Sequence, residues 1–141
     1  MSSLIPITSV RLIVKNSDGQ VLILRRSNSS HANGSWCLPG GKVDYGDTVE
    51  ETAIKELREE TNLECTSTEF LFFQDSLPDE ASEMHVINFY FACVTKGDLQ
   101  LNEESSESAW ITQGDISSYE IVFNNAAGLE KYWASFSESQ D

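Results

Sequence analysis

Three glutamates on one predicted helix have the chemistry and spacing of a metal site. Glu59 and Glu60 follow Glu56 by three and four residues. Side chains at these offsets share a helix face, so three carboxylates would lie side by side and repel one another. A cation would neutralise this repulsion, and hard oxygen ligands favour Mg²⁺ or Mn²⁺. The sequence therefore predicts that these residues bind a divalent cation.

The segment around the glutamates predicts how they are held. A glycine-rich loop at Gly40 and Gly41 precedes a helix that we expect to begin at Asp47 or Thr48. The helix should end near Asn62, because asparagine tolerates the left-handed conformation that closes many helices. The expected apolar face of this helix consists of Ala53, Ile54 and Leu57.

The rest of the chain indicates an α/β fold. Residues 10–25 predict a hairpin, because Asp18-Gly19 is a strong turn signal between two apolar segments. A last helix should be capped by Asn124 or Asn125 and be followed by a polar, frayed tail at 137–141. No linker or repeat interrupts the pattern, so we expect a single domain over residues 1–141. Further strands are expected at 36–38, 70–73, 84–94 and 109–111, and loops at 27–35, 77–83 and 102–108.

The charge of the chain narrows the class of ligand. Nine Lys and Arg residues stand against 23 Asp and Glu, which gives a net charge of −14. Such a surface argues against binding nucleic acid polymers, whose phosphates favour basic proteins, and against anionic membranes. A small phosphorylated substrate remains compatible with this charge if a divalent metal screens the repulsion.

Composition also bears on the compartment. No apolar stretch approaches the roughly 18 residues that span a bilayer, and the first residues do not resemble a signal peptide. Cys37, Cys65 and Cys93 are far apart and odd in number, which is typical of reduced thiols and not of a disulfide framework or a zinc site. We therefore expect a cytoplasmic protein.

Residues 41–63 resemble the Nudix (MutT-like) box. Gly41 is followed after five residues by Asp47, and after seven more by Lys55-Glu56-Leu57-Arg58-Glu59-Glu60-Thr61-Asn62-Leu63. The spacing matches the family pattern throughout, and Trp36-x-Leu-Pro-Gly-Gly resembles the usual approach to the box. The resemblance implies a Nudix-type α/β/α sandwich, with a mixed central sheet and the box helix packed on it.

Three positions of the box depart from the family pattern. Asp47 stands where the family has Glu, Lys55 where it has Arg, and Asn62 where it has Gly. The family's Arg orients the glutamates through ion pairs, and Lys cannot make the two-pronged contact of a guanidinium. All three glutamates are kept, so we interpret the site as active, with altered rate or metal preference.

The resemblance implies hydrolysis of a nucleoside diphosphate linked to another group. It implies Mg²⁺ as the cofactor, with Mn²⁺ as the alternative, bound by Glu56, Glu59 and Glu60. A carbonyl of Gly40 or Gly41 would complete the set of ligands, because glycine lets the backbone approach closely. Metal ions in such sites neutralise phosphate oxygens and activate water.

The resemblance leaves more than one candidate residue for the other catalytic roles. Glu59 is the first candidate for the base that deprotonates water, and in this family the base can instead come from a later loop, where Glu104 and Glu107 are candidates. Lys55 takes the position of the orienting Arg. Arg25 or Arg26, at a strand end, would contact substrate phosphate.

Aromatic and amide side chains are weaker candidates for contacts with a nucleobase. Trp36, Phe72 or Tyr90 could stack on a base, although aromatic residues in strands usually belong to the core. Asn124 and Asn125 could read a base edge, but a helix cap explains at least one of them. His31 and His85 lack metal-ligand spacing.

Several alternatives stay open on the sequence alone. The substrate could be a nucleoside triphosphate, an oxidised nucleotide, ADP-ribose or a nucleotide sugar, and attack could occur at carbon of a GDP-sugar. A nucleotide-binding domain without turnover is the alternative outside enzymes. Many relatives of this family are dimers, so a homodimer is also open. Specificity would lie in the loops 27–35, 76–83 and 102–108.

Overall fold

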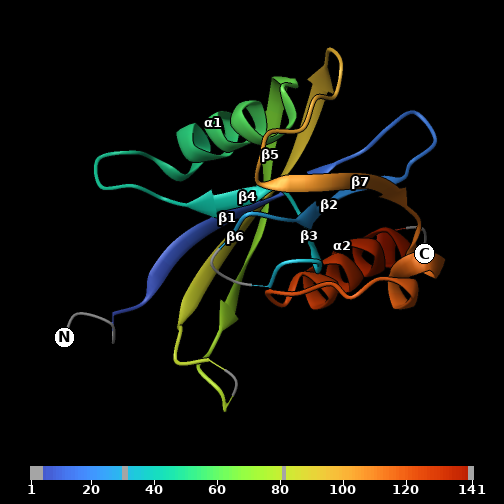
Figure 1. Cartoon of the computed structure of the whole chain (residues 1–141). Helices are drawn as coiled ribbons and strands as arrows, with labels where there is room; N and C mark the ends of the chain where they lie inside the picture. The colour runs from blue at the N-terminus through green and yellow to red at the C-terminus, as the bar shows by residue number, and fades with distance from the viewer. Residues whose placement is uncertain (1–4, 30–31, 81, 140–141) are drawn as a thin grey trace.

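The computed structural model describes residues 5–29, 32–80 and 82–139 (Figure 1). The fold is an α/β/α sandwich, as expected, with strands between α1 and α2. In chain order the elements are β1 (Ile7–Val14), β2 (Val21–Arg26), β3 (Trp36–Cys37), β4 (Gly40–Lys42), α1 (Val49–Thr61), β5 (Glu64–Ser76), β6 (Val86–Lys96), β7 (Ser105–Ile111), the 3-10 helix η2 (Gln113–Ser118) and α2 (Asn125–Ser139).

Two sheets form the centre of the fold. The first has the strand order β4-β1-β6-β5 and is mixed, because β1 runs parallel to β6 and antiparallel to β4. The second has the order β3-β2-β7 and is antiparallel. One buried cluster lies where α1 covers the first sheet, and a second lies between the sheets and α2. The mixed sheet under the box helix confirms the expected architecture.

The hairpin expected at residues 10–25 is only partly correct. The turn is present, with Gly19 at φ +79°, but β1 and β2 belong to different sheets and share only the bridge Lys15–Val21. β6 pairs along one edge of β1, and β4 pairs with Ser9–Arg11 on the other edge. β2 pairs with β3 and β7 instead.

Other boundaries also differ from the expectation. Residues 105–108 belong to β7 and not to an acidic loop, because their backbone pairs with β2. β5 is much longer than residues 70–73. Gly40–Lys42 forms a strand that the Pro-Gly-Gly sequence did not indicate. The tail expected from residue 137 is helical to Ser139, and residues 140–141 lie outside the described part.

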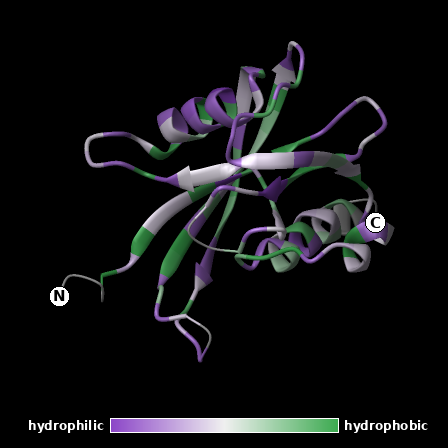
Figure 2. Cartoon of the chain, viewed as in Figure 1, coloured by the Kyte–Doolittle hydropathy of each residue, from purple (hydrophilic) through white to green (hydrophobic). Residues whose placement is uncertain are grey.

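Helix α1 follows the expected signals closely. Thr48 is its N-cap in a reciprocal capping box, in which Thr48 Oγ1 accepts from Glu51 N and Glu51 Oε1 accepts from Thr48 N. Ala53 and Leu57 are buried as expected, but Ile54 is 44 % exposed. Position 54 points away from the sheet, and Thr52 and Thr61 fill the buried face instead. Figure 2 shows the contrast between the mostly hydrophilic helix and the hydrophobic segments of the strands.

The cap at Asn62 gives a first testable prediction. Asn62 closes α1 at φ 65°, its N–H donates to Arg58 O, and its side chain donates to Asp98 O. We expect Asn62→Ala to lower the free energy of unfolding by about 1 kcal/mol, because alanine is strained in this conformation. Urea unfolding followed by tryptophan fluorescence measures the change. Asn62→Gly is the control and should be at least as stable as Ala; equal stability of alanine and wild type would contradict the prediction.

Helix α2 lies on the other side of the sheets from α1 (Figure 1). Leu129 and Tyr132 anchor it in the second buried cluster. It begins at Asn125, as expected, but the Asn125 side chain accepts from Leu38 N at 2.9 Å and thereby holds the segment after β3. None of the helices in the described residues is long and apolar enough to cross a membrane.

Candidate active site

The carboxylates of α1 lie directly on the glycines of β4. Gly40 N donates to Glu60 Oε1 at 3.2 Å. A Cβ added to Gly41 would lie 2.7 Å from Glu56 Cδ and 2.8 Å from Glu56 Oε1, so only glycine leaves room for this side chain. β4 is in turn held by β1, where Ser9 Oγ donates to Gly41 O at 3.1 Å. Strand pairing and helix packing therefore place Glu56 and Glu60 against the backbone of β4.

Burial and mutual repulsion control the charge of this pair. Burial, and then the neighbouring Glu56, raise the pKa of Glu60 well above its ordinary value, and the Gly40 N–H and Arg11 oppose this only in part. Burial also raises the pKa of Glu56, to which the charges of Glu59 and Glu104 contribute. A proton shared between the two carboxyl groups lowers the pKa of Glu56 and raises that of Glu60. Such a pair needs a proton or a cation to be stable.

The third glutamate of the box is placed differently. Glu59 is exposed, and its backbone carbonyl accepts from Asn102 Nδ2 at 3.0 Å. Within the described ranges, no three His, Cys, Asp or Glu side chains gather closely enough to hold a metal ion by themselves. Backbone carbonyls, water or substrate oxygens would have to complete a shell begun by Glu56 and Glu60.

The residues present nevertheless fit a hard divalent cation. The available donors are all oxygens, namely two carboxylates and the carbonyls of Gly40 and Gly41, which suits Mg²⁺ or Mn²⁺. Mg²⁺ usually takes one or two protein carboxylates and fills its other positions with water and phosphate oxygens. The raised pKa of Glu60 indicates a place where positive charge would be favourable.

Lys55 pairs with two aspartates in the loop before α1. Its Nζ lies 3.2 Å from Asp44 Oδ2 and 3.3 Å from Asp47 Oδ2. Asp44, and then Asp47, raise the pKa of Lys55. Lys55 therefore ties the loop before α1 to the helix. It acts on Glu56 only through its charge, which opposes the rise in the pKa of that carboxyl.

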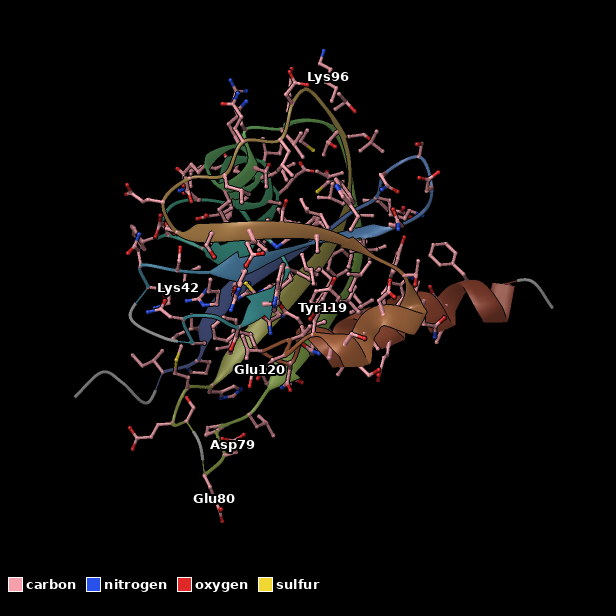
Figure 3. The ribbon with its side chains drawn as sticks, turned by 45° about the vertical axis from the view of Figure 1, so that its right-hand side comes forward. Lys42, Asp79, Glu80, Lys96, Tyr119 and Glu120 are labelled. Carbon is pink, nitrogen blue, oxygen red and sulfur yellow. The ribbon has the colours of Figure 1, made fainter. Side chains whose placement is uncertain are left out.

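A cavity of about 760 Å³ opens beside the carboxylates. Both sheets contribute to it, together with the segments before β7 and α2. Figure 3 labels two residues that line it, Lys42 on β4 and Asp79 in the connection between β5 and β6. Among the residues predicted to be functional, Gly40, Glu60, Arg26, Glu104 and Asn124 line this cavity.

Two guanidinium groups lie above one aromatic ring in the cavity. The Cζ atoms of Arg26 and Arg11 are 4.7 Å and 5.1 Å from the centre of the Phe123 ring. Arg11 Nη1 also donates to Leu38 O at 3.1 Å. The sequence interpretation missed Arg11 and Phe123. A charged residue inside the apolar strand 10–14 was a signal for Arg11, whereas nothing local distinguishes Phe123.

Several predicted residues lie away from this cavity. Arg25 pairs with Glu107 across β2 and β7 and donates to Gly34 O. The Trp36 ring packs edge-on against Tyr119, with centroids 5.0 Å apart, beside the second buried cluster. The Arg25, Glu107 and Trp36 side chains are therefore occupied elsewhere. Of the two loop glutamates, Glu104 is the one that faces the carboxylates.

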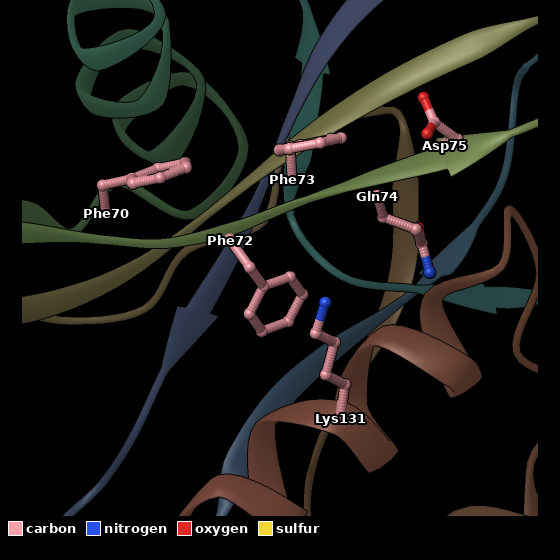
Figure 4. Close-up of a pocket in the computed structure, with 6 residues that line it drawn as sticks. All are labelled: Phe70, Phe72, Phe73, Gln74, Asp75 and Lys131. Carbon is pink, nitrogen blue, oxygen red and sulfur yellow. The ribbon is translucent and has the colours of Figure 1, made fainter.

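A second hollow lies on the outer side of β5 (Figure 4). Phe72 faces Lys131, whose Nζ is 4.6 Å from the ring centre, and the Phe72 ring stacks on the buried Tyr90 at 4.8 Å. Phe70 and Phe73 are 52 % and 55 % exposed. This hollow contains none of the box glutamates. His85 is half-buried, and the prediction for His31 lies outside the described residues.

Comparison with known proteins places this geometry in one family. A family model described as NUDIX domain matches residues 6–132. An ADP-ribose pyrophosphatase from Methanocaldococcus jannaschii is 34 % identical over 116 residues, which cover 82 % of this chain and 66 % of that protein. A nucleoside triphosphatase NudI from Enterobacter sp. is 28 % identical over 123 residues, covering 81 % and 87 %. A putative nudix hydrolase from Caenorhabditis elegans matches with 31 % identity over 78 % of this chain, which spans only 30 % of the worm protein.

Solved structures share the arrangement. A MutT protein from Methanosarcina mazei has a TM-score of 0.78 and 27 % identity, and the match covers 96 % of each chain. The Nudix domain of NrtR from Shewanella oneidensis, solved with ADP ribose, has a TM-score of 0.76 and 21 % identity, covering 94 % of this chain and 89 % of that one. The likeness to the second structure concerns the fold alone.

Proposed function

The chain belongs to the Nudix family, and from this premise we propose that it hydrolyses the diphosphate bond of a nucleoside diphosphate derivative. The observation that carries the proposal is the half-buried pair Glu56–Glu60 beside the glycines of β4, with Glu60 in the wall of a cavity that Arg11 and Arg26 also line. Related proteins named for ADP-ribose and for nucleoside triphosphates support the substrate class.

The substrate's diphosphate would lie between carboxylates and guanidiniums. When bound by Glu56, Glu60 and the Gly40 carbonyl, Mg²⁺ or Mn²⁺ would neutralise phosphate oxygens and lower the pKa of the attacking water. Arg11, on the strand next to Gly40, and Arg26 would hold the phosphate oxygens. With a net charge of −14, the chain depends on such local positive charge to admit an anionic substrate.

Two residues are candidates for the base that takes the proton from water. Glu59 is exposed on the helix beside Glu56, and Glu104 lines the cavity from the turn before β7. Glu104 is held there by its backbone, which donates to Asn102 Oδ1 and accepts from Ser27 N. We propose Glu59 first and Glu104 as the alternative. We also propose a single domain acting in the cytoplasm, which the three free thiols support.

Metal dependence gives the direct test of this function. With Mg²⁺ we expect hydrolysis of at least one compound in a panel of nucleoside triphosphates, ADP-ribose and nucleotide sugars, with a nucleoside monophosphate or sugar phosphate as product. A chelator should lower the rate by more than about 100-fold, because the metal supplies the activated water. Chromatography of the products measures this, and Glu59→Gln and Glu104→Gln distinguish the two bases.

The alternatives give different results in the same experiment. Tight binding of one nucleotide without turnover would support a binding domain. Reaction in ¹⁸O-labelled water distinguishes attack at phosphorus from attack at carbon, since the label enters a phosphate in the first case and the sugar in the second.

A further inference from the structure

Asn88 is a buried amide in the wall of the proposed substrate cavity. It lies near the start of β6, opposite Ser9 of β1 and Gln74 of β5. Its side chain is 2 % exposed, yet it lines the same cavity as Gly40 and Glu60. Buried polar groups in proteins are normally hydrogen-bonded, so each polar atom of this amide should have a partner.

The surrounding hydrogen bonds fix the orientation of the amide. The backbone carbonyl of Asn124 can only accept, so the group that donates to it, at 3.0 Å, is Gln74 Nε2. Gln74 Oε1 is therefore an acceptor, and it receives Tyr90 OH at 3.1 Å and Asn88 Nδ2 at 3.2 Å. It follows that Asn88 presents its oxygen, and not its amino group, on the other side.

That oxygen is buried and has no partner among the described residues. Asn88 Oδ1 shares this property with Arg11 Nε, which lines the same cavity. An unpaired buried acceptor costs free energy, so a group that donates to it would bind favourably. The pair offers one acceptor and one donor to a ligand.

The position of Asn88 indicates which part of a ligand it meets. In the strand order β4-β1-β6, Asn88 is two strands away from Gly40, a separation of roughly 10 Å at the usual strand spacing. Arg11 lies between the two, on the same face of β1 as Ser9. The lining beyond Asn88 contains the apolar side chains of Val86, Met84 and Leu77, and its charged member, Asp79, is a carboxylate that would repel phosphate. Phosphates fit the end near β4, and a flat neutral group fits the end near β6.

We propose that Asn88 Oδ1 accepts a hydrogen bond from an N–H group of the substrate's nucleobase. Asn88 is then a specificity-determining residue that distinguishes nucleotides from phosphorylated sugars without a base. The inference rests on the proposed function only in taking the ligand to be a nucleotide. It does not depend on whether the diphosphate bond is cleaved.

Binding measurements on the full chain test the proposal. The probes are AMP, GMP, CMP, UMP and ribose 5-phosphate, each titrated with Mg²⁺ into the wild type and Asn88→Leu, which has a similar volume. In the wild type, at least one nucleotide should bind about 10-fold or more tightly than ribose 5-phosphate. Asn88→Leu should weaken that nucleotide by about 10- to 100-fold and leave ribose 5-phosphate within about 2-fold.

A second measurement keeps the proposal testable if Asn88→Leu does not fold. Analogues of the preferred nucleotide in which each base N–H is replaced in turn by C–H or N-methyl are titrated into the wild type, and one of them should lose about 10-fold or more in affinity. Unchanged binding of every analogue, or of the nucleotide to Asn88→Leu, would mean that Oδ1 holds only water and would overturn the proposal. Equal loss of ribose 5-phosphate would overturn it as well. Asn88-dependent binding without any hydrolysis would refute the proposed activity but leave this inference standing.

Discussion

Glu60→Gln is expected to lower metal-dependent hydrolysis by more than about 100-fold while leaving the fold intact. Glutamine keeps the oxygen that accepts from Gly40 N, so the contact between α1 and β4 can persist. What it removes is the negative charge that, with Glu56, would hold the cation. Loss of a group that merely supports a metal ligand already costs 10- to 100-fold, so loss of the ligand itself should cost more. Initial rates at saturating Mg²⁺ and the circular dichroism spectrum measure the two effects.

Glu60→Gln should lower activity but raise thermal stability at pH 8. Burial raises the pKa of Glu60, so the fold favours its protonated form. The resulting stabilisation is fully present below the pKa of an unfolded glutamate and is lost as the pH rises through the folded pKa. In a chelator, the wild type should therefore lose thermal stability from pH 5 to pH 8. Glu60→Gln should lose less and melt at a higher temperature than the wild type at pH 8.

A matched control separates this effect from a general change in charge. Glu69 is an exposed glutamate on β5, so Glu69→Gln should leave both the rate and the pH dependence of melting unchanged. Added Mg²⁺ should raise the melting temperature of the wild type and of Glu69→Gln, and have little effect on Glu60→Gln. An active Glu60→Gln protein that Mg²⁺ still stabilises would remove Glu60 from the metal site.

The local part of the site was predictable from sequence because it lies within one continuous segment. Thr48, Glu51 and Asn62 bound α1 through contacts of a few residues, and the spacing of Glu56 and Glu60 follows from helix geometry alone. Glu59 is next to Glu60 in sequence but is exposed. The sheet covers only part of the helix circumference, because the buried face of a surface helix is about 100° wide.

The rest of the cavity lining was not predictable in this way. Arg11, Asn88 and Phe123 come from β1, β6 and the segment before α2, and only the strand order brings them together. Arg25 and Arg26 are adjacent in sequence, and alternation along β2 sends only Arg26 to the cavity. Side chains also alternate along β7, so Glu107 points toward Arg25 and away from the carboxylates. This was not predicted, because residues 102–108 were expected to form a loop.

The two glycines of β4 should respond to alanine in different ways. A Cβ on Gly40 would overlap the Val10 carbonyl oxygen and lie 3.0 Å from its carbon, and neither backbone atom can move without breaking the pairing of β1 and β4. A Cβ on Gly41 would instead meet the end of the Glu56 side chain, which can rotate away. Gly40→Ala should therefore lose about 3 kcal/mol or more of unfolding free energy, and Gly41→Ala about 1 kcal/mol or less.

Among the molecules that remain folded, Gly41→Ala should lose more activity than Gly40→Ala. Gly41→Ala should displace the Glu56 carboxylate from its place on β4, and a misplacement of about 1 Å can cost about 100-fold in rate. Urea unfolding and initial rates with Mg²⁺ measure both quantities, and Gly114→Ala, where the nearest atom to a new Cβ is 3.9 Å away, is the neutral control. A fully active and stable Gly41→Ala protein would mean that hydrolysis does not need Glu56 beside β4. If the proposed function is correct, Gly41 leaves the volume in which the Glu56 carboxylate would meet a cation.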